Sequence, residues 1–262
     1  MVEIQEETDN GGGRTNNSNE QQNTPSRPTV MEYLKSESTN TFLCILRIAT
    51  VFFSISYALP YSNNPSYYSK AMIAAAVTNG IRLSQRVGSF QFSRESLALI
   101  LLEDSFHYLL YSLLFAMNNP MTMALVPVAL FGLLHSVNFI NKAALATGHG
   151  NNVIIVKAHT LVNQQTNNLL GIVATGEIFM FPILFAMILT GKGTVLMPFA
   201  YYKFLGLRYS SRRNPYTRIA FSQMKQSLIQ ACSSPNCPGM VSGFIYKTIA
   251  FVERLAPQTV ST

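Results

Sequence analysis

The chain has 262 residues, of which 48% are hydrophobic and only 12% are charged. An ordinary soluble domain carries roughly 25% charged residues, so this composition excludes a typical soluble enzyme and favours a membrane-embedded protein. The net charge of +7 raises nucleic acid as a partner, but the basic residues flank apolar segments, which is the pattern of a membrane protein. We therefore expect no nucleic-acid function.

The first segment, residues 1–40, is polar and holds seven acidic and three basic side chains. It contains too few apolar residues to offset the entropy of ordering, so we predict a disordered tail with a short helical lead-in at residues 31–35. A cleavable signal peptide needs an apolar run near the start, and this segment has none. The first apolar segment is therefore expected to act as an uncleaved signal-anchor.

Between residues 41 and 207, apolar segments of helical length alternate with polar turns. The sequence predicts an all-α, polytopic membrane domain here, arranged as three helical hairpins. Segment 66–83 is weaker than the others and, taken alone, could be an amphipathic surface helix. The stretch 141–165 is polar and is predicted to carry only a turn or two of amphipathic helix. The six predicted membrane segments are 41–59, 66–83, 97–117, 121–140, 169–190 and 194–207.

The connectors divide into two kinds, which predicts the topology. The turns around 61–66, 118–120 and 191–193 are short and nearly neutral, whereas the other connectors are basic. Basic connectors stay in the cytosol, so both termini are expected there. The chain then divides into the tail 1–40, the membrane domain 41–207 and a basic cytosolic region 208–262.

The last region carries two segments, 216–231 and 240–255, in which apolar residues recur at helical spacing opposite basic ones. We predict amphipathic helices that lie on the cytosolic leaflet. Packing on the cytosolic ends of the bundle is the alternative. The residues predicted to contact the membrane surface or a partner are Arg208, Arg212, Arg213, Arg218, Phe221, Lys225 and Phe244.

Ionisable residues inside the predicted membrane segments need an explanation, because each costs about 2.5–3.5 kcal/mol at mid-helix. They are predicted to form an intramembrane polar network in the cytosolic third of the domain. Its members are Arg47, Glu103, Asp104, His107, His135 and Glu177.

Two interpretations of this network stay open. Glu103 and His107 are spaced i, i+4 and share a helix face, so with a further acid or histidine they could handle a metal ion or protons. In the structural interpretation, Arg47 pairs with Glu103 or Asp104. No zinc-protease, P-loop or nucleophile-elbow motif is present, and the three cysteines suggest neither a disulfide framework nor a zinc site. We therefore predict no enzymatic activity, no metal and no cofactor.

Four stretches carry a resemblance to a known family. They are IRLSQRVGSFQFSRE (81–95), LALILLEDSFHYLLYSLLF (97–115), PFAYYKFLGLRYSSRRNPY (198–216) and IAFVERLAP (249–257). In these stretches the chain resembles the transmembrane protein 33 family, which includes Krüppel homologue 2 and the yeast pore-membrane proteins.

The resemblance implies a multi-pass protein of the endoplasmic reticulum and nuclear envelope, without catalytic residues. It implies a role in the tubular network and the nuclear pore, through reticulon-type membrane-shaping proteins and pore components, with the lipid bilayer as the other partner. No small-molecule substrate is expected. The alternative is a channel, transporter or channel regulator in calcium homeostasis that uses the intramembrane acids, which would need a continuous polar path.

Overall fold

The computed structural model describes residues 27–59, 64–88, 93–211, 214–234 and 237–256. Within these ranges the chain forms α-helices and no strand, so the predicted all-α class is confirmed. Most of the predicted disordered tail lies outside the described residues. The helices are α1 (Val30–Ser36), α2 (Ser38–Ala58), α3 (Pro65–Val87), α4 (Arg94–Leu102), α5 (Asp104–Ala116), α6 (Thr122–Ala146), α7 (Val153–Leu189), α8 (Leu196–Ser210), α9 (Tyr216–Cys232) and α10 (Gly239–Leu255).

The short helix α1 forms at the predicted helical lead-in because its first turn is capped. The Glu32 amide donates to Thr29 Oγ1 at 3.3 Å, and the Thr29 amide donates to Glu32 Oε2 at 2.8 Å. Hydrogen bonds from Thr29 hold the pKa of the Glu32 carboxyl below its usual value. Since α2 then begins at Ser38, helix starts earlier than the predicted boundary at residue 41.

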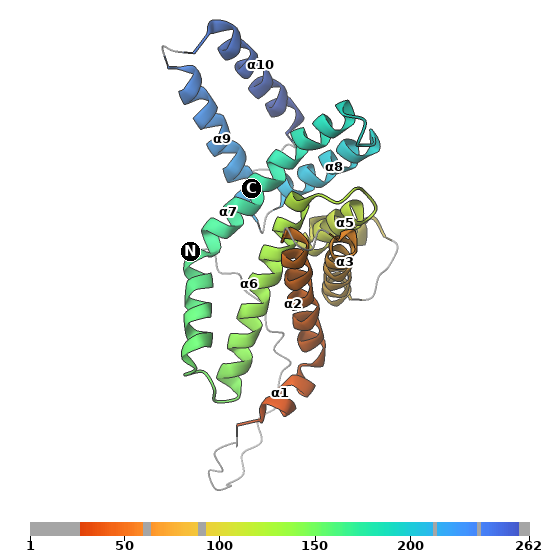
Figure 1. The fold of residues 1–262 in the computed structure, drawn as a ribbon, viewed down its shortest axis with the longest axis vertical. Coiled ribbons are helices and arrows are strands. Elements are labelled where there is room, and N and C mark those ends of the chain that lie inside the picture. The colour runs from red at the N-terminus through yellow and green to blue at the C-terminus, as the bar shows by residue number, and fades with distance from the viewer. Residues whose placement is uncertain (1–26, 60–63, 89–92, 212–213, 235–236, 257–262) are drawn as a thin grey trace.

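The core lies where α3, α5, α6, α7 and α8 meet (Figure 1), and it is rich in aromatic side chains. Tyr111 and Phe115 of α5 are fully buried with ring centroids 4.6 Å apart, and Tyr201 of α8 packs against both. Buried hydroxyls need partners. The Tyr111 hydroxyl donates to the Ala124 carbonyl at 3.0 Å, which ties α5 to the start of α6.

Among the described residues, three helices are long and apolar enough to cross a membrane, namely α2, α6 and α7. The pair α4–α5 would make a fourth if it counts as one span, although its two parts are bent by 73°. Consecutive helices of each predicted hairpin do pack on each other, α2 on α3, α5 on α6 and α7 on α8. At 15 residues, however, α8 is only about 22 Å long, so complete crossing by all six segments stays a prediction.

Two predicted segments differ from the structure. The segment 97–117 is not one helix, because α4 ends at Leu102 and α5 starts at Asp104. The polar stretch 141–165 is mostly helical: α6 extends to Ala146, and Asn152 caps the start of the 37-residue α7. Polarity misled the prediction here, because only the connector between the two helices contains glycine, Gly148 and Gly150, and the polar residues on either side of it are compatible with a helix.

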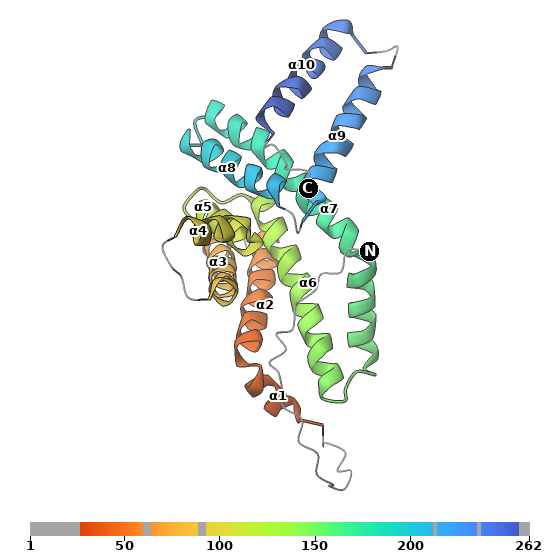
Figure 2. The same ribbon diagram turned by 180° about the vertical axis from the view of Figure 1, so that it is seen from behind.

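The C-terminal helices form a hairpin that projects from this bundle. α9 packs on α7, whereas α10 packs on α9 (Figure 1). The view from behind shows the same hairpin projecting at the end of the molecule opposite α1 (Figure 2). The core therefore lies between α1 and the α9–α10 hairpin. Which side of the membrane each of these two ends faces stays a prediction.

A glycosylation sequon inserted with spacers at Asn118–Pro120 should be modified in cells, because this neutral turn is predicted to face the lumen. The same insertion between Gly148 and Asn152 should stay unmodified, because Lys142 and Lys157 flank that connector. A gel-mobility shift that endoglycosidase reverses measures the outcome. Modification of the second site instead of the first would contradict the predicted topology.

Candidate functional site: a buried ion-pair cluster

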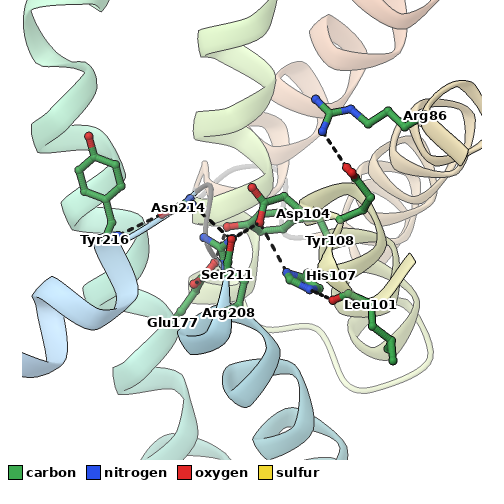
Figure 3. A network of polar contacts seen from close by, with 11 residues as sticks. Arg86, Leu101, Asp104, His107, Tyr108, Glu177, Arg208, Ser211, Asn214 and Tyr216 are labelled. Atoms are coloured by element: carbon green, nitrogen blue, oxygen red, sulfur yellow. Dashed lines mark hydrogen bonds and ion pairs between the residues drawn. The ribbon is translucent and has the colours of Figure 1, made fainter. Parts of the chain in front are cut away.

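Arg208, near the end of α8, is completely buried and holds two carboxylates that come from other helices (Figure 3). Its Nε donates to Glu177 Oε2 of α7 at 3.2 Å, and its Nη1 donates to Asp104 Oδ1 of α5 at 3.1 Å. Charge-assisted bonds of this kind are stronger than neutral hydrogen bonds. One guanidinium therefore joins three helices.

Glu177 is 1% exposed, and tyrosines complete its surroundings. The Tyr108 hydroxyl donates to Glu177 Oε1, and the Tyr201 hydroxyl donates to the Glu177 backbone carbonyl at 2.7 Å. The Arg208 guanidinium also lies over the Tyr108 ring, 4.9 Å from its centroid, in a cation–π contact. The acid is thus satisfied on both oxygens inside an aromatic wall.

Asp104 is the first residue of α5 and is less buried, with 29% of its side chain exposed. Ser211 Oγ donates to Asp104 Oδ1 at 3.0 Å, and His107 Nδ1 lies 3.6 Å from the same oxygen. On the other side of the ring, His107 Nε2 lies 2.8 Å from the Leu101 carbonyl oxygen. That oxygen can only accept, so Nε2 carries a proton, and His107 bridges the break between α4 and α5.

We call this group of side chains the Arg208 cluster. It brings two carboxylates, one guanidinium and one imidazole together in the interior. Its members are Asp104, His107, Tyr108, Glu177, Arg208 and Ser211.

Neighbouring side chains occupy the carboxylates of the cluster, whereas two of its buried nitrogens, Arg208 Nη2 and His107 Nδ1, have no hydrogen-bond partner among the described residues. The carboxylates bind a guanidinium and hydroxyl groups, and no group of three or more His, Cys, Asp or Glu among the described residues could hold a metal ion. Removing one partner of a buried ion pair typically costs 3–5 kcal/mol, because the other charge stays buried and unpaired. The geometry accordingly supports a structural role that fixes helix positions.

The six predicted members of the intramembrane network are only partly brought together. Asp104, His107 and Glu177 lie in the Arg208 cluster, whereas Glu103 lies beside it and forms an ion pair of 2.7 Å with Arg86. Arg47 is buried on α2, and His135 of α6 stacks on Phe131. The cations described at Asp104 and Glu103 are Arg208 and Arg86. The pairing of Arg47 with either acid stays a prediction.

For Arg208 the prediction of a surface contact is wrong, because the side chain is 0% exposed. Its neighbours Arg212 and Arg213 suggested a surface cluster, and both lie outside the described residues. The informative signal was helical spacing, since Tyr201, Phe204 and Arg208 fall on one buried face of α8. The sequence analysis did not name Tyr108 and Ser211 of the cluster, nor Tyr201, whose hydroxyl contacts Glu177.

The other predicted surface residues divide between two environments. On α9, Phe221 is half-buried against Tyr209, with ring centroids 5.7 Å apart, and Arg218 is half-buried. Lys225 is exposed and pairs with Glu253 of α10. Phe244 of α10 is 71% exposed. Packing on the bundle thus describes α9, whereas α10 keeps a free face.

Replacing Arg208 by Met should lower the free energy of unfolding by about 3–5 kcal/mol, because two carboxylates would lose their cation. Adding Glu177→Gln should restore part of this loss. Lys225→Met, which breaks an exposed pair, is the control and should cost at most about 1 kcal/mol. Urea unfolding of the detergent-solubilised full chain measures all three. An Arg208→Met protein as stable as the control would contradict the structural role.

The helices and the buried cluster define an all-helical, multi-pass membrane protein whose interior charges are paired with one another. The profile of the family described as Transmembrane protein 33/Nucleoporin POM33 matches residues 22–258. The chain belongs to this family, as the resemblance predicted.

Individual relatives agree with this assignment. The chain is 44% identical over 227 residues to the Transmembrane protein 33 homolog of Caenorhabditis elegans, covering 84% of this chain and 83% of the relative. It is 38% identical to Transmembrane protein 33 of Homo sapiens, with 90% of this chain and 96% of the relative covered. For Krueppel homolog 2 of Drosophila melanogaster the identity is 36%, with coverage of 90% and 85%. No solved structure matches the chain significantly.

Proposed function

We propose that this protein is a non-catalytic organiser of the endoplasmic reticulum and nuclear envelope membrane. In this proposal it binds the bilayer together with membrane-shaping, reticulon-type partners and nuclear pore components. The description of its family, which names a nucleoporin, supports the location. The observation that carries the proposal is helix α10, which has no buried residue and exposes an apolar face.

The free face of α10 carries large apolar side chains at helical spacing, with Lys247 among them. Met240, Phe244 and Phe251 are 89%, 71% and 61% exposed, and they lie within one arc of the helix. Exposed apolar surface of this kind marks a contact with a membrane or a partner. Lys247 and Arg254 are the basic residues of α10, and they favour an anionic lipid surface.

The attachment of α10 leaves this face available. α9 is anchored in the bundle by Ala220, which packs with Ala174, Ile178 and Leu205. α10 is then held against its neighbours by the Lys225–Glu253 ion pair and by the Tyr202 hydroxyl, which donates to the Leu255 carbonyl at 3.2 Å. These contacts use the opposite side or the end of α10, so its apolar face points away from the bundle.

The contacts of the Arg208 cluster favour an organiser over a transporter or an enzyme. A transport path needs polar groups that exchange partners along a continuous route. Here Glu177 is enclosed by tyrosines and by Arg208, and His107 is fully buried. This packing supports a scaffold whose outer helices make the functional contacts.

The double variant Phe244→Glu with Phe251→Glu should leave the fold intact, because both side chains are exposed, but should abolish membrane-partner contacts made by α10. In the full-length protein in its native membrane, crosslinking with mass spectrometry should show loss of α10 crosslinks to membrane-shaping partners. Microscopy should show reduced enrichment on the tubular network and nuclear envelope.

Ala250→Glu is the control for added charge outside the apolar face, because it places one glutamate at an exposed position on another side of α10, and the single variant Phe244→Glu is its charge-matched counterpart. The Ala250→Glu variant should retain the crosslinks and the localisation. A double variant that keeps every partner crosslink and its localisation would contradict the proposal, as would an equal loss in the control.

A further inference from the structure

Helix α4 exposes apolar side chains on most of its surface, although it is only nine residues long. Leu97, Leu99 and Leu102 are 54%, 63% and 49% exposed, and Leu101 is exposed as well. Ile100 is its one buried apolar residue. An arrangement with four exposed leucines in nine residues is unfavourable in water, so α4 requires an apolar medium or partner.

Both ends of α4 are polar, and this limits how it can lie in a bilayer. At its start Ser93 caps the helix by accepting from the Ser96 amide at 3.1 Å. At its end stands the Glu103–Arg86 ion pair, in which 41% of the Arg86 side chain is exposed. Partly exposed charges belong at a polar boundary and not at the bilayer centre.

Length then excludes a crossing by α4 alone. Nine residues span only about 14 Å, whereas the hydrocarbon core is about 30 Å thick. A helix this short with polar groups at both ends can keep both ends at one boundary only if it runs along that boundary. The 73° bend from α5 agrees, because α5 carries the buried Tyr111 and Phe115 into the core while α4 turns away.

The bend is fixed by contacts at the junction. His107 of α5 donates to the carbonyl of Leu101 in the last turn of α4, and Asp104 is held by Arg208 and Ser211. Glu103, between the two helices, is held by Arg86 of α3. The direction of α4 is therefore part of the folded structure.

We propose that α4 is an in-plane helix seated at the boundary between headgroups and acyl chains of one leaflet, where its leucines contact phospholipid. This makes α4 a second lipid-binding surface, separate from α10. Because it inserts into one leaflet only, it occupies area on one side of the bilayer. The proposal depends on the membrane embedding of the bundle and not on the partners proposed for α10.

The chain contains no tryptophan, so a single introduced tryptophan reports its own depth without background. Leu97→Trp and Leu101→Trp place the probe at exposed positions one turn apart on the same face of α4. The full-length variants are reconstituted into phosphatidylcholine vesicles whose acyl chains are brominated at defined positions, and quenching gives the depth. Leu113→Trp, on α5, serves as a reference that should lie deeper.

We expect equal depths for Leu97→Trp and Leu101→Trp, within about 2 Å, because an in-plane helix keeps one face at one level. A helix that continues across the membrane would separate them by about 6 Å. Such a separation would overturn the proposal, and so would emission typical of water without quenching. Leu99→Trp and Leu102→Trp form a second pair, for which a crossing helix predicts about 4.5 Å, should either member of the first pair fail to fold.

Discussion

The position of one guanidinium, that of Arg208, constrains the rest of the bundle. A buried cation is tolerated only where carboxylates meet it with good geometry, so α5 and α7 must deliver Asp104 and Glu177 to the same place. Tyr108 and Tyr201 then fill the space around Glu177 and satisfy its remaining acceptors. Sliding any of the three helices by one turn would leave a charge unpaired, which makes the cluster a determinant of helix register.

The same interaction explains where the predicted segment 97–117 breaks. Asp104 begins α5, so its carboxylate lies at the helix N-terminus, where the macrodipole favours a negative charge. Glu103 precedes it and faces Arg86 of α3, so the two consecutive acids bind cations on different helices. The 73° bend lies at these two residues, and the two ion pairs hold it in place.

From the sequence alone, the helical class, the positions of the apolar segments and the gathering of ionisable residues could be predicted. Depth along each helix follows from counting residues, which places both Arg47 and Asp104 in the cytosolic third of the predicted domain. Pairing depends instead on which side of each helix faces which neighbour, and Asp104 and Arg208 come from distant parts of the chain. Hydropathy also cannot detect the break at Glu103, because the five leucine and isoleucine residues of α4 keep the average hydropathy of this segment high. Burial of Arg208 was visible only as helical spacing in α8.

The contacts inside the bundle are stronger than those that hold α10, and this difference affects how the protein can bind a membrane. Opening of the junction between α5, α7 and α8 would expose paired charges to an apolar environment, so this part should remain closed. α9 is anchored in the bundle around Ala220, whereas α10 is held by an exposed ion pair and an exposed hydrogen bond, which are weak contacts. We therefore expect α10 to adjust its angle to a surface while the bundle keeps its shape. A rigid interior with an adjustable apolar helix at its edge is consistent with the membrane contact proposed for α10, whereas catalysis requires groups that are held in a fixed geometry.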